Sequence, residues 1–564
     1  MRKLFLITTV LAVSAVAQNL TPAQKDADFR YLASLFSTYY APADWKKQLF
    51  GVDVLNIQPW LDKVAKTQTD LDFYEVCVDY VASLNDSHDR FSMTSDFIAR
   101  LGFTTDVYDG SMLIDSINRT LLPSKNYPFT FGDELISIDG VDAKQILASY
   151  MKYAPQGNPS AARRIAAARL TIRPQSVMPH ATDVGDTANV VIRRSNGNSE
   201  TYTIPWTKTG TPLTVGPVPS PKSVKQPQPR LASEPDYMAP LRELQWSGVL
   251  NPEETGLNGY GSQAPVFAAS LPSFQFTRRL GGSASDFFYS GTFKFFELTI
   301  GYIRIPNYAP TSTSLALQTF EKEIAFMNAN TDGLIVDEMR NTGGNLCFGE
   351  NVAQRLIPYP FRATAFETRA FWGRVVGFYD AMIAAKAANA SWDVIQQYEL
   401  IYNELLSAAQ SGRRVTDPIP LCSSSSDLQP AMDAAGNVIA YLKPIMLLTD
   451  EFTTSTADSV AGMMQDNNRA TLYGMRTNGA GGNNTTLDAG VFSEGITGMT
   501  LALQSRKDYV GTAGYPVTKY IENVGVHPNI EVDYMTKDDL LQNGAPFVDK
   551  FLQAMAAYIR TQSQ

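Results

Sequence analysis

Hydrophobic residues recur with a helical period over the first part of the chain. Between residues 19 and 95, aromatic and aliphatic side chains are spaced at i, i+3 and i+4, as in TPAQKDADFRYLASLFSTYYA and QTDLDFYEVCVDYVASL. This spacing gathers them on one face of a helix, so the region is predicted to be helical. It ends in the polar turn NDSHDRFS.

The period changes to short apolar runs with turn residues between about residues 98 and 207. FTFGDELISIDGVDAKQILASYM contains a predicted strand, a D-G turn and a helix that begins at Asp142. ANVVIRRSNGNSETYTIPW predicts a hairpin with N-G at its turn. Residues 211–240 are rich in proline, and no element can be assigned up to about residue 290, so a linker or an exposed loop is expected there.

Strand and helix patterns alternate from about residue 295. LTIGYIRIP, DGLIVDEM, IMLLTD, TLYGM and GMTLALQS predict strands, whereas STSLALQTFEKEIAFMNAN, ENVAQRLI and residues 455–467 predict helices. The stretch MIAAKAANASWDVIQQYELIYNELLSAAQSG looks like an inserted helical segment. Such alternation predicts right-handed βαβ crossovers and a largely parallel sheet.

The predicted fold class is therefore multidomain α/β. We expect a helical region over residues 18–97, a β-rich domain over 98–210, and a Pro/Gly-rich linker or cleft-covering segment over 211–290. An α/β core over 291–545 and a C-terminal helix or tail over 546–564 complete the chain.

Composition and charge narrow the possible partners. The chain is 44% hydrophobic and 18% charged, as in globular proteins. A formal charge of -9 with no Lys/Arg run argues against nucleic acid or anionic lipid as a partner. No run after the N-terminus reaches the ~18 apolar residues that a membrane span needs.

The first seventeen residues, MRKLFLITTVLAVSAVA, combine a basic start, an apolar stretch and an A-V-A triplet. This pattern predicts a secretory signal peptide over residues 1–17, with a buried N-terminal helix as the alternative. The mature chain is expected to be secreted and extracellular, or periplasmic in a bacterium. Three cysteines, Cys77, Cys347 and Cys422, allow one disulfide with one free thiol, but small buried apolar residues are an equal alternative.

Hydroxyl side chains cluster in EFTTSTADSVAGMMQD, residues 451–466, directly after a predicted buried strand. Thr454 or Ser455 could simply cap the following helix. A hydroxyl there would also face the carboxyl edge of the sheet, where free first-turn N–H groups, beginning with that of Thr456, favour developing negative charge. A serine nucleophile needs a base, and the chain has three histidines, His88, His180 and His527.

Other catalytic signatures are missing from the sequence. There is no G-x-S-x-G elbow, no H-E-x-x-H and no cysteine cluster, so neither a zinc site nor any other cofactor is expected. Carboxylate pairs are too numerous to single out one pair for glycoside hydrolysis.

Several separated motifs carry a family resemblance. They are FGDELISIDGVDA, GYIRIPNY, DGLIVDEMRNTGGN, STAD with QDNNRATLYG, and ENVGVHPNIEVD. In this order they resemble the tail-specific, or C-terminal-processing, serine protease family over about residues 75–210 and 295–535. The resemblance implies a PDZ-like domain that binds or gates peptides by strand addition, a protease core, and a protein or peptide substrate; a homo-oligomer is possible.

The resemblance places the nucleophile at Ser455, with Asp458 in place of the usual glutamate. One branch of the family uses a lysine base, but TNGAGG has Ala480 at that position. The tricorn-like branch, which includes the chlamydial protease-like activity factor, uses a histidine instead. NDSHDRF and IENVGV then supply Ser87, His88 and Glu522.

By this resemblance His88 would be the general base, and Glu522 would orient it directly or through Ser87. The N–H of Thr456 and one from Gly343 and Gly344 would form the oxyanion hole. A secreted serine endopeptidase with a Ser-His-Glu site and an acyl-enzyme is the expected function. An inactive peptide-binding scaffold of the same fold is the alternative, and a carbohydrate-active enzyme is a weaker one.

Overall fold

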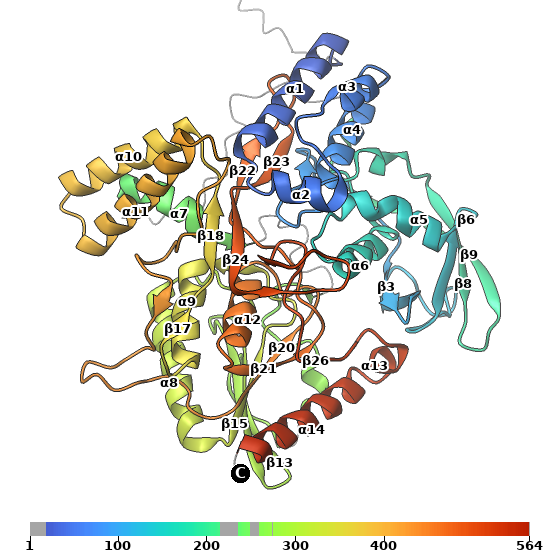
Figure 1. Cartoon of the computed structure of the whole chain (residues 1–564). Coiled ribbons are helices and arrows are strands. Elements are labelled where there is room, and N and C mark those ends of the chain that lie inside the picture. Colours follow the sequence, from blue (N-terminus) through green and yellow to red (C-terminus); the bar gives the residue numbers. More distant parts are fainter. Residues whose placement is uncertain (1–18, 215–234, 249–258, 273–274, 563–564) are drawn as a thin grey trace, which may run out of the picture.

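The computed structural model describes residues 19–214, 235–248, 259–272 and 275–562. The predicted signal peptide and the most proline-rich stretch, residues 215–234, lie outside this part of the chain. In Figure 1 the N-terminal helices lie at the top, the second domain at the right, and the C-terminal helix at the bottom. None of the helices within the described ranges is long and apolar enough to cross a membrane.

The N-terminal region is helical, as its i, i+3, i+4 pattern predicts. Its helices are α1 (Pro22–Tyr39), α2 (Ala43–Phe50), α3 (Gln58–Val64) and α4 (Asp70–Ala82). Thr21 and Thr69 begin α1 and α4 with capping boxes, which satisfy the first free N–H groups of each helix. The turn after α4 carries His88 and leads into the short strand β1 (Phe91–Ser92).

The second domain is β-rich and contains two helices. Its larger sheet has the order β3-β4-β5-β8-β9, with β6 beside β5, and a smaller sheet has the order β10-β2-β7. The predicted N-G hairpin joins β8 to β9, and Asp142 caps α5 as expected. Its elements are β2 (Ile98–Arg100), β3 (Phe103–Tyr108), β4 (Ser111–Ile117), β5 (Glu134–Ile138), β6 (Val141–Asp142), α5 (Ala143–Tyr150), α6 (Pro159–Arg169), β7 (Ile172–Pro174), β8 (Thr187–Arg193), β9 (Ser199–Pro205) and β10 (Thr207–Thr209).

The core is a seven-stranded sheet of order β12-β13-β14-β15-β20-β21-β26. Strands β14, β15, β20, β21 and β26 of this sheet are parallel. At one edge β13 pairs antiparallel with β14, and β12 pairs antiparallel with β13. The multidomain α/β class is thereby confirmed. The elements are β12 (Thr277–Leu280), β13 (Tyr289–Phe295), β14 (Leu298–Arg304), α8 (Thr313–Asn330), β15 (Gly333–Asp337), α9 (Leu346–Leu356), β20 (Ile445–Thr449), α12 (Thr456–Asp466), β21 (Ala470–Gly474) and β26 (Ile530–Glu531).

Both faces of this sheet are covered, which explains its continuous apolar runs. Leu334 and Val336 of β15 pack with α8, α9 and α12 on one face. Ile335 points the other way, where α14 (Ala545–Gln562) packs against the sheet with Phe551 and Met555. The segment expected to be a C-terminal helix or tail is thus a helix that packs on the core, preceded by α13 (Lys537–Leu541).

The single strand predicted for GMTLALQS is wrong, because the segment divides between two small antiparallel sheets. β23 (Ile496–Thr500) pairs with β22 (Asn484–Asp488) and with β1, whereas β24 (Ala502–Val510) pairs with β18 (Ala365–Thr368) and β25 (Thr518–Tyr520). The chain changes partners at Leu501 so that β23 can support the turn that carries His88. The hydrophobic period of the local sequence does not reveal such a change of pairing partner.

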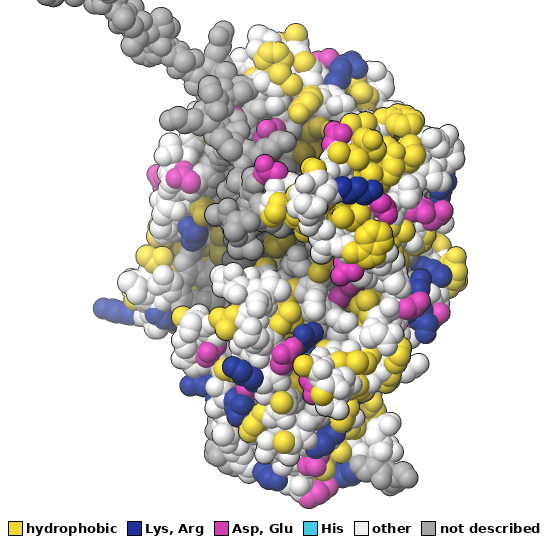
Figure 2. Space-filling view, turned by 90° about the vertical axis from the view of Figure 1, so that its left-hand side faces the viewer, with side chains coloured by type: hydrophobic (Ala, Val, Ile, Leu, Met, Phe, Trp, Pro, Cys, Tyr) yellow, Lys and Arg dark blue, Asp and Glu magenta, His cyan; other side chains and the backbone are white. Residues whose placement is uncertain are grey.

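The inserted helical segment forms a hairpin of α10 (Trp372–Ala387) and α11 (Trp392–Gln410), which projects to the left in Figure 1. A disulfide joins Cys347 of α9 to Cys422 beyond the hairpin, and Cys77 is a buried free thiol. Four exposed hydrophobic side chains, Trp372, Val376, Tyr379 and Ile383, follow the outer face of α10. Figure 2 looks onto this side of the molecule, where hydrophobic side chains gather.

Candidate active site

The candidate nucleophile lies in the loop between β20 and α12. Ser455 directly precedes α12, is completely buried, and has φ 65° and ψ -111°. Such a backbone conformation is costly for a residue with a Cβ and persists only where the surroundings impose it. The loop therefore holds the Ser455 side chain at the carboxyl edge of the sheet in a strained position.

Asp458 fixes this strained loop from the first turn of α12. Its carboxylate accepts hydrogen bonds from the N–H of Ser455 at 2.6 Å, of Gly479 at 3.0 Å and of Ala480 at 3.2 Å, and from the hydroxyl of Thr477. Burial raises the pKa of Asp458 to about 6, and these donors oppose the rise. The short Asp side chain thus joins the nucleophile loop to the turn that carries Ala480.

His88 is brought to Ser455 from the other end of the chain. Its Nε2 lies 2.8 Å from Ser455 Oγ, and the side chain is buried. The His88 turn is pressed against β23, since a Cβ at Gly498 would lie 1.9 Å from the His88 carbonyl oxygen. Burial lowers the pKa of His88 to about 4, so the imidazole is neutral near pH 7 and can accept a proton.

The other two histidines lie elsewhere. His180 contacts Asp72 at 3.3 Å and Asp183 at 2.9 Å and is partly exposed. His527 is exposed, and its backbone oxygen accepts a hydrogen bond from Gln465. Of the three histidines, all within the described ranges, His88 alone has a contact with Ser455 among the hydrogen bonds of the structure.

Glu522 and Ser87 have partners other than the imidazole in the described structure. Glu522 accepts from the Lys46 ammonium on one oxygen and from the Gly481 N–H, at 2.8 Å, on the other. Burial raises the pKa of Glu522 to about 8, against the effect of Lys46. The Ser87 hydroxyl donates to Asn478 and accepts from the N–H of Gly157. The expected contact of Glu522 with His88, direct or through Ser87, is absent from these hydrogen bonds.

The expected oxyanion donors border Ser455 on the side of β16 (Gly343–Asn345). Gly343 has φ 75°, and a Cβ there would lie 2.8 Å from the Ser455 Cβ, so only glycine permits this approach. Its N–H donates to Asn341 Oδ1 at 2.9 Å. The Thr456 hydroxyl donates to the backbone oxygens of Ser247 and Gly344.

A short strand from the unassigned segment fills the space beside Ser455. β11 (Trp246–Gly248), which follows α7 (Ala239–Gln245), pairs antiparallel with β16, with Ser247 opposite Gly344. Ser247 Oγ lies 2.6 Å from Ser455 Oγ and donates to the Gly482 carbonyl at 2.6 Å. Ser247 therefore competes with His88 for the single Ser455 proton.

Sequence reasoning missed three residues that surround the candidate site: Ser247, Lys46 and Asp86. Ser247 lies in a segment without a periodic pattern, and Lys46 is an ordinary lysine on an amphipathic helix. Asp86 could have been noticed, because it is an acidic residue two positions before His88.

One buried arginine connects the second domain to the nucleophile loop. Arg164 of α6 forms hydrogen bonds with Asp106 of β3 at 2.7 Å, with Glu451 at 2.7 Å and with the Tyr534 hydroxyl at 2.6 Å. Glu451 belongs to the loop that leads to Ser455. Arg164 thus links α6 to that loop by buried hydrogen bonds, beside the packing of Ile165 of α6 with Phe452.

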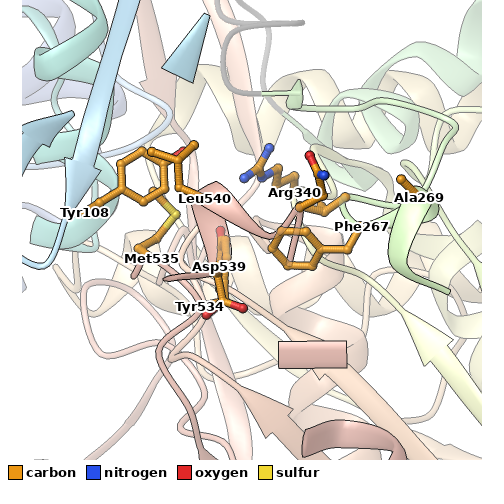
Figure 3. Close-up of a pocket in the computed structure, with 10 residues that line it drawn as sticks. Tyr108, Phe267, Ala269, Arg340, Tyr534, Met535, Asp539 and Leu540 are labelled. Atoms are coloured by element: carbon orange, nitrogen blue, oxygen red, sulfur yellow. The ribbon is translucent and has the colours of Figure 1, made fainter. Parts of the chain in front are cut away.

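A cavity of about 250 Å³ lies near this junction, shown in Figure 3. Tyr108, Phe267, Arg340, Tyr534 and Asp539 are among the residues that line it. Neither Ser455 nor His88 lines this cavity.

Comparison with known families matches both domains. Residues 299–532 match the model of Peptidase family S41, and residues 98–213 match that of a PDZ domain. A protein of Chlamydia trachomatis serovar D is 24% identical over 97% of this chain and 95% of its own length. A protein of Chlamydia pneumoniae is 23% identical over 93% of this chain and 89% of its own.

Solved structures share the fold along almost the whole chain. The crystal structure of mature CPAF is similar with a TM-score of 0.73, at 20% identity, over 96% of this chain and 99% of that one. The structure of mature CPAF complexed with lactacystin has a TM-score of 0.71, at 21% identity, over the same shares. The resemblance inferred from the motifs is confirmed. Residues 299–532 are thus a Peptidase family S41 domain preceded by a PDZ domain, and the chain has the serine protease fold of that family.

Proposed function

We propose that this chain is a secreted serine endopeptidase with Ser455 as its nucleophile and His88 as its general base. The observation that carries the proposal is the 2.8 Å contact between His88 Nε2 and Ser455 Oγ, made at a serine with a strained backbone. A cap residue needs neither a histidine partner nor a positive φ.

The proposed reaction follows from these positions. His88 Nε2 takes the Ser455 proton as Oγ attacks the scissile carbonyl carbon, and then gives it to the leaving amine. Water hydrolyses the resulting acyl-enzyme by the reverse transfers. The N–H of Thr456 and one of the Gly343 and Gly344 amides would bind the oxyanion, after Asn341 has released Gly343 if that amide is used.

We propose that β11 holds the enzyme closed by occupying the place of a substrate. Its antiparallel pairing with β16 is the arrangement in which an extended peptide would add to that strand. Because Ser247 contacts both Ser455 and Gly482, β11 must leave before a substrate carbonyl can reach Ser455.

The first test is labelling by a fluorophosphonate probe, with peptide mapping. We expect label on Ser455 that is lost in Ser455→Ala and reduced at least about 10²-fold in His88→Ala. His180→Ala is the matched control, because it removes a distant histidine. Labelling is measured before and after limited proteolysis within residues 211–290, which should increase it.

Two results would contradict the proposal. Label that survives His88→Ala at the wild-type rate would exclude His88 as the base. A folded, cleaved protein that no probe labels, yet that still binds peptides, would instead be an inactive scaffold, in keeping with Ala480 at the lysine position.

A further inference from the structure

The imidazole of His88 lacks a hydrogen-bond partner on its second nitrogen. If Nε2 accepts the Ser455 proton, Nδ1 must carry the ring proton. Nδ1 is buried and has no hydrogen-bond acceptor within the described ranges. A buried N–H without a partner is costly, so the surrounding groups should show which one supports it.

Asp86 is the carboxylate that faces this nitrogen. Its Oδ1 lies 3.9 Å from His88 Nδ1 and accepts the backbone N–H of His88 at 3.0 Å. Both Glu522 oxygens accept from other donors, Lys46 and Gly481. Turning the ring toward Asp86 would close the remaining gap, whereas the hydrogen bonds and ion pairs of the described residues include no contact between Glu522 and His88.

Asp86 is itself held in place from three elements. The Tyr40 hydroxyl at the end of α1 donates to its Oδ2 at 2.9 Å. The Thr500 hydroxyl of β23 lies 3.2 Å from each oxygen, and Lys46 of α2 lies 3.7 Å away. A carboxylate fixed in this way keeps its distance and direction from the ring.

We propose that Asp86 is the positioning carboxylate of His88, fixing its tautomer and offsetting the charge of its imidazolium. The inference rests on the proposed function, because it assigns a role within the same site. Asp86 acts through His88 and does not touch the substrate. Glu522 then serves mainly to hold Lys46 and the Gly481 turn.

The proton balance of the step agrees with this role. The Ser455 O–H bond breaks, the Nε2–H bond forms, and the ring carries one positive charge until Nε2 protonates the leaving amine. The Nδ1 proton stays on the ring throughout. Among the described residues, the titratable groups around His88 are Asp86 and Asp89 of its own turn, Lys46, Tyr40 and Glu522. Of these, Asp86 is the one that contacts Nδ1, at 3.9 Å.

The test is the pH profile of fluorophosphonate labelling at Ser455, with wild type, Asp86→Asn and Glu522→Gln treated alike. The Asp86 charge favours the imidazolium, so its removal should lower the His88 pKa. We therefore expect Asp86→Asn to move the acidic limb to lower pH and to reduce the plateau rate about 10²–10⁴-fold. Asp183→Asn, which changes an exposed carboxylate beside the distant His180, is the control and should keep the wild-type limb.

The outcomes separate this inference from the proposed function. The inference would be overturned if Glu522→Gln shifted the acidic limb of the labelling profile and Asp86→Asn did not. It would also be overturned if folded Asp86→Asn kept the acidic limb of the wild type. If Asp86→Asn does not fold, Lys46→Met is measured in its place. It removes the cation that opposes Asp86 and should move the acidic limb to higher pH, so an acidic limb that stays in place contradicts the inference. Wild-type protein without label at any pH would instead contradict the proposed function.

Discussion

Asp458 is the residue on which the position of Ser455 depends. Four donors converge on its carboxylate, and three of them, from Thr477, Gly479 and Ala480, belong to the turn TNGAGG. An aspartate is one methylene shorter than the glutamate common in the family, so it keeps the turn close to α12. The substitution is thus compatible with an ordered nucleophile loop.

Asp458→Asn should destabilise the protein by about 2–4 kcal/mol, because an amide NH2 would face backbone N–H donors in a buried place. Urea denaturation measures this difference. Asp380→Asn on the exposed face of α10 makes the same chemical change and should alter the unfolding free energy by less than about 0.5 kcal/mol. Equal stability of the two variants would show that the Asp458 contacts contribute little.

Individual residues were predictable where sequence motifs mark them. The hydroxyl cluster and the S-H turn pointed to Ser455 and His88, and the structure brings the two side chains together. The position of Glu522 against Lys46 was not predictable, because a buried ion pair between residues 476 positions apart leaves no local pattern.

β11 is an element of three residues with a disproportionate effect on the site. It covers Ser455 and adds a strand to β16, yet the sequence around it has no strand period. Pairing with a distant glycine-rich strand decides its conformation, which is why the segment could not be assigned from sequence. The longer elements of the core, such as β15 and α8, were predicted because each buries a periodic apolar face.

Gly248→Val should loosen β11, since a Cβ at Gly248 would lie 2.9 Å from the Gly344 backbone nitrogen. Overpacking that destabilises the pairing of β11 with β16 by about 1–3 kcal/mol would raise the fraction of molecules in which β11 has left Ser455 roughly 5- to 150-fold. The labelling of Ser455 should increase accordingly. Gly377→Val on α10 is the control, as nothing lies within 4 Å of its added Cβ. Unchanged labelling of folded Gly248→Val would mean that β11 does not limit access.

At the scale of the whole molecule, one disulfide joins distant positions within the described residues. The Cys347–Cys422 disulfide closes a loop of 75 residues that contains the α10–α11 hairpin. Disulfides persist in oxidising compartments, so this bond supports the proposal of secretion together with the signal-like N-terminus. The first seventeen residues would be removed on export.

The exported protein should begin at Gln18, as mass spectrometry of the secreted or periplasmic fraction would show. Alkylation of the denatured, unreduced protein should modify Cys77 alone, and all three cysteines after reduction. Cytoplasmic protein that retains Met1 and three free thiols would contradict the proposed localisation.

His88 and Ser455 stand on opposite sides of the segment that contains β11. A single cut within residues 211–290 would therefore place base and nucleophile on two separate polypeptides, and the disulfide, which lies wholly in the second, would not join them. Such a nicked enzyme would be a heterodimer whose activity depends on the pairing of β1 with β23 and on the buried contacts of Arg164. Neither fragment alone would hold a complete active site, so catalysis would report directly on whether the two halves remain associated.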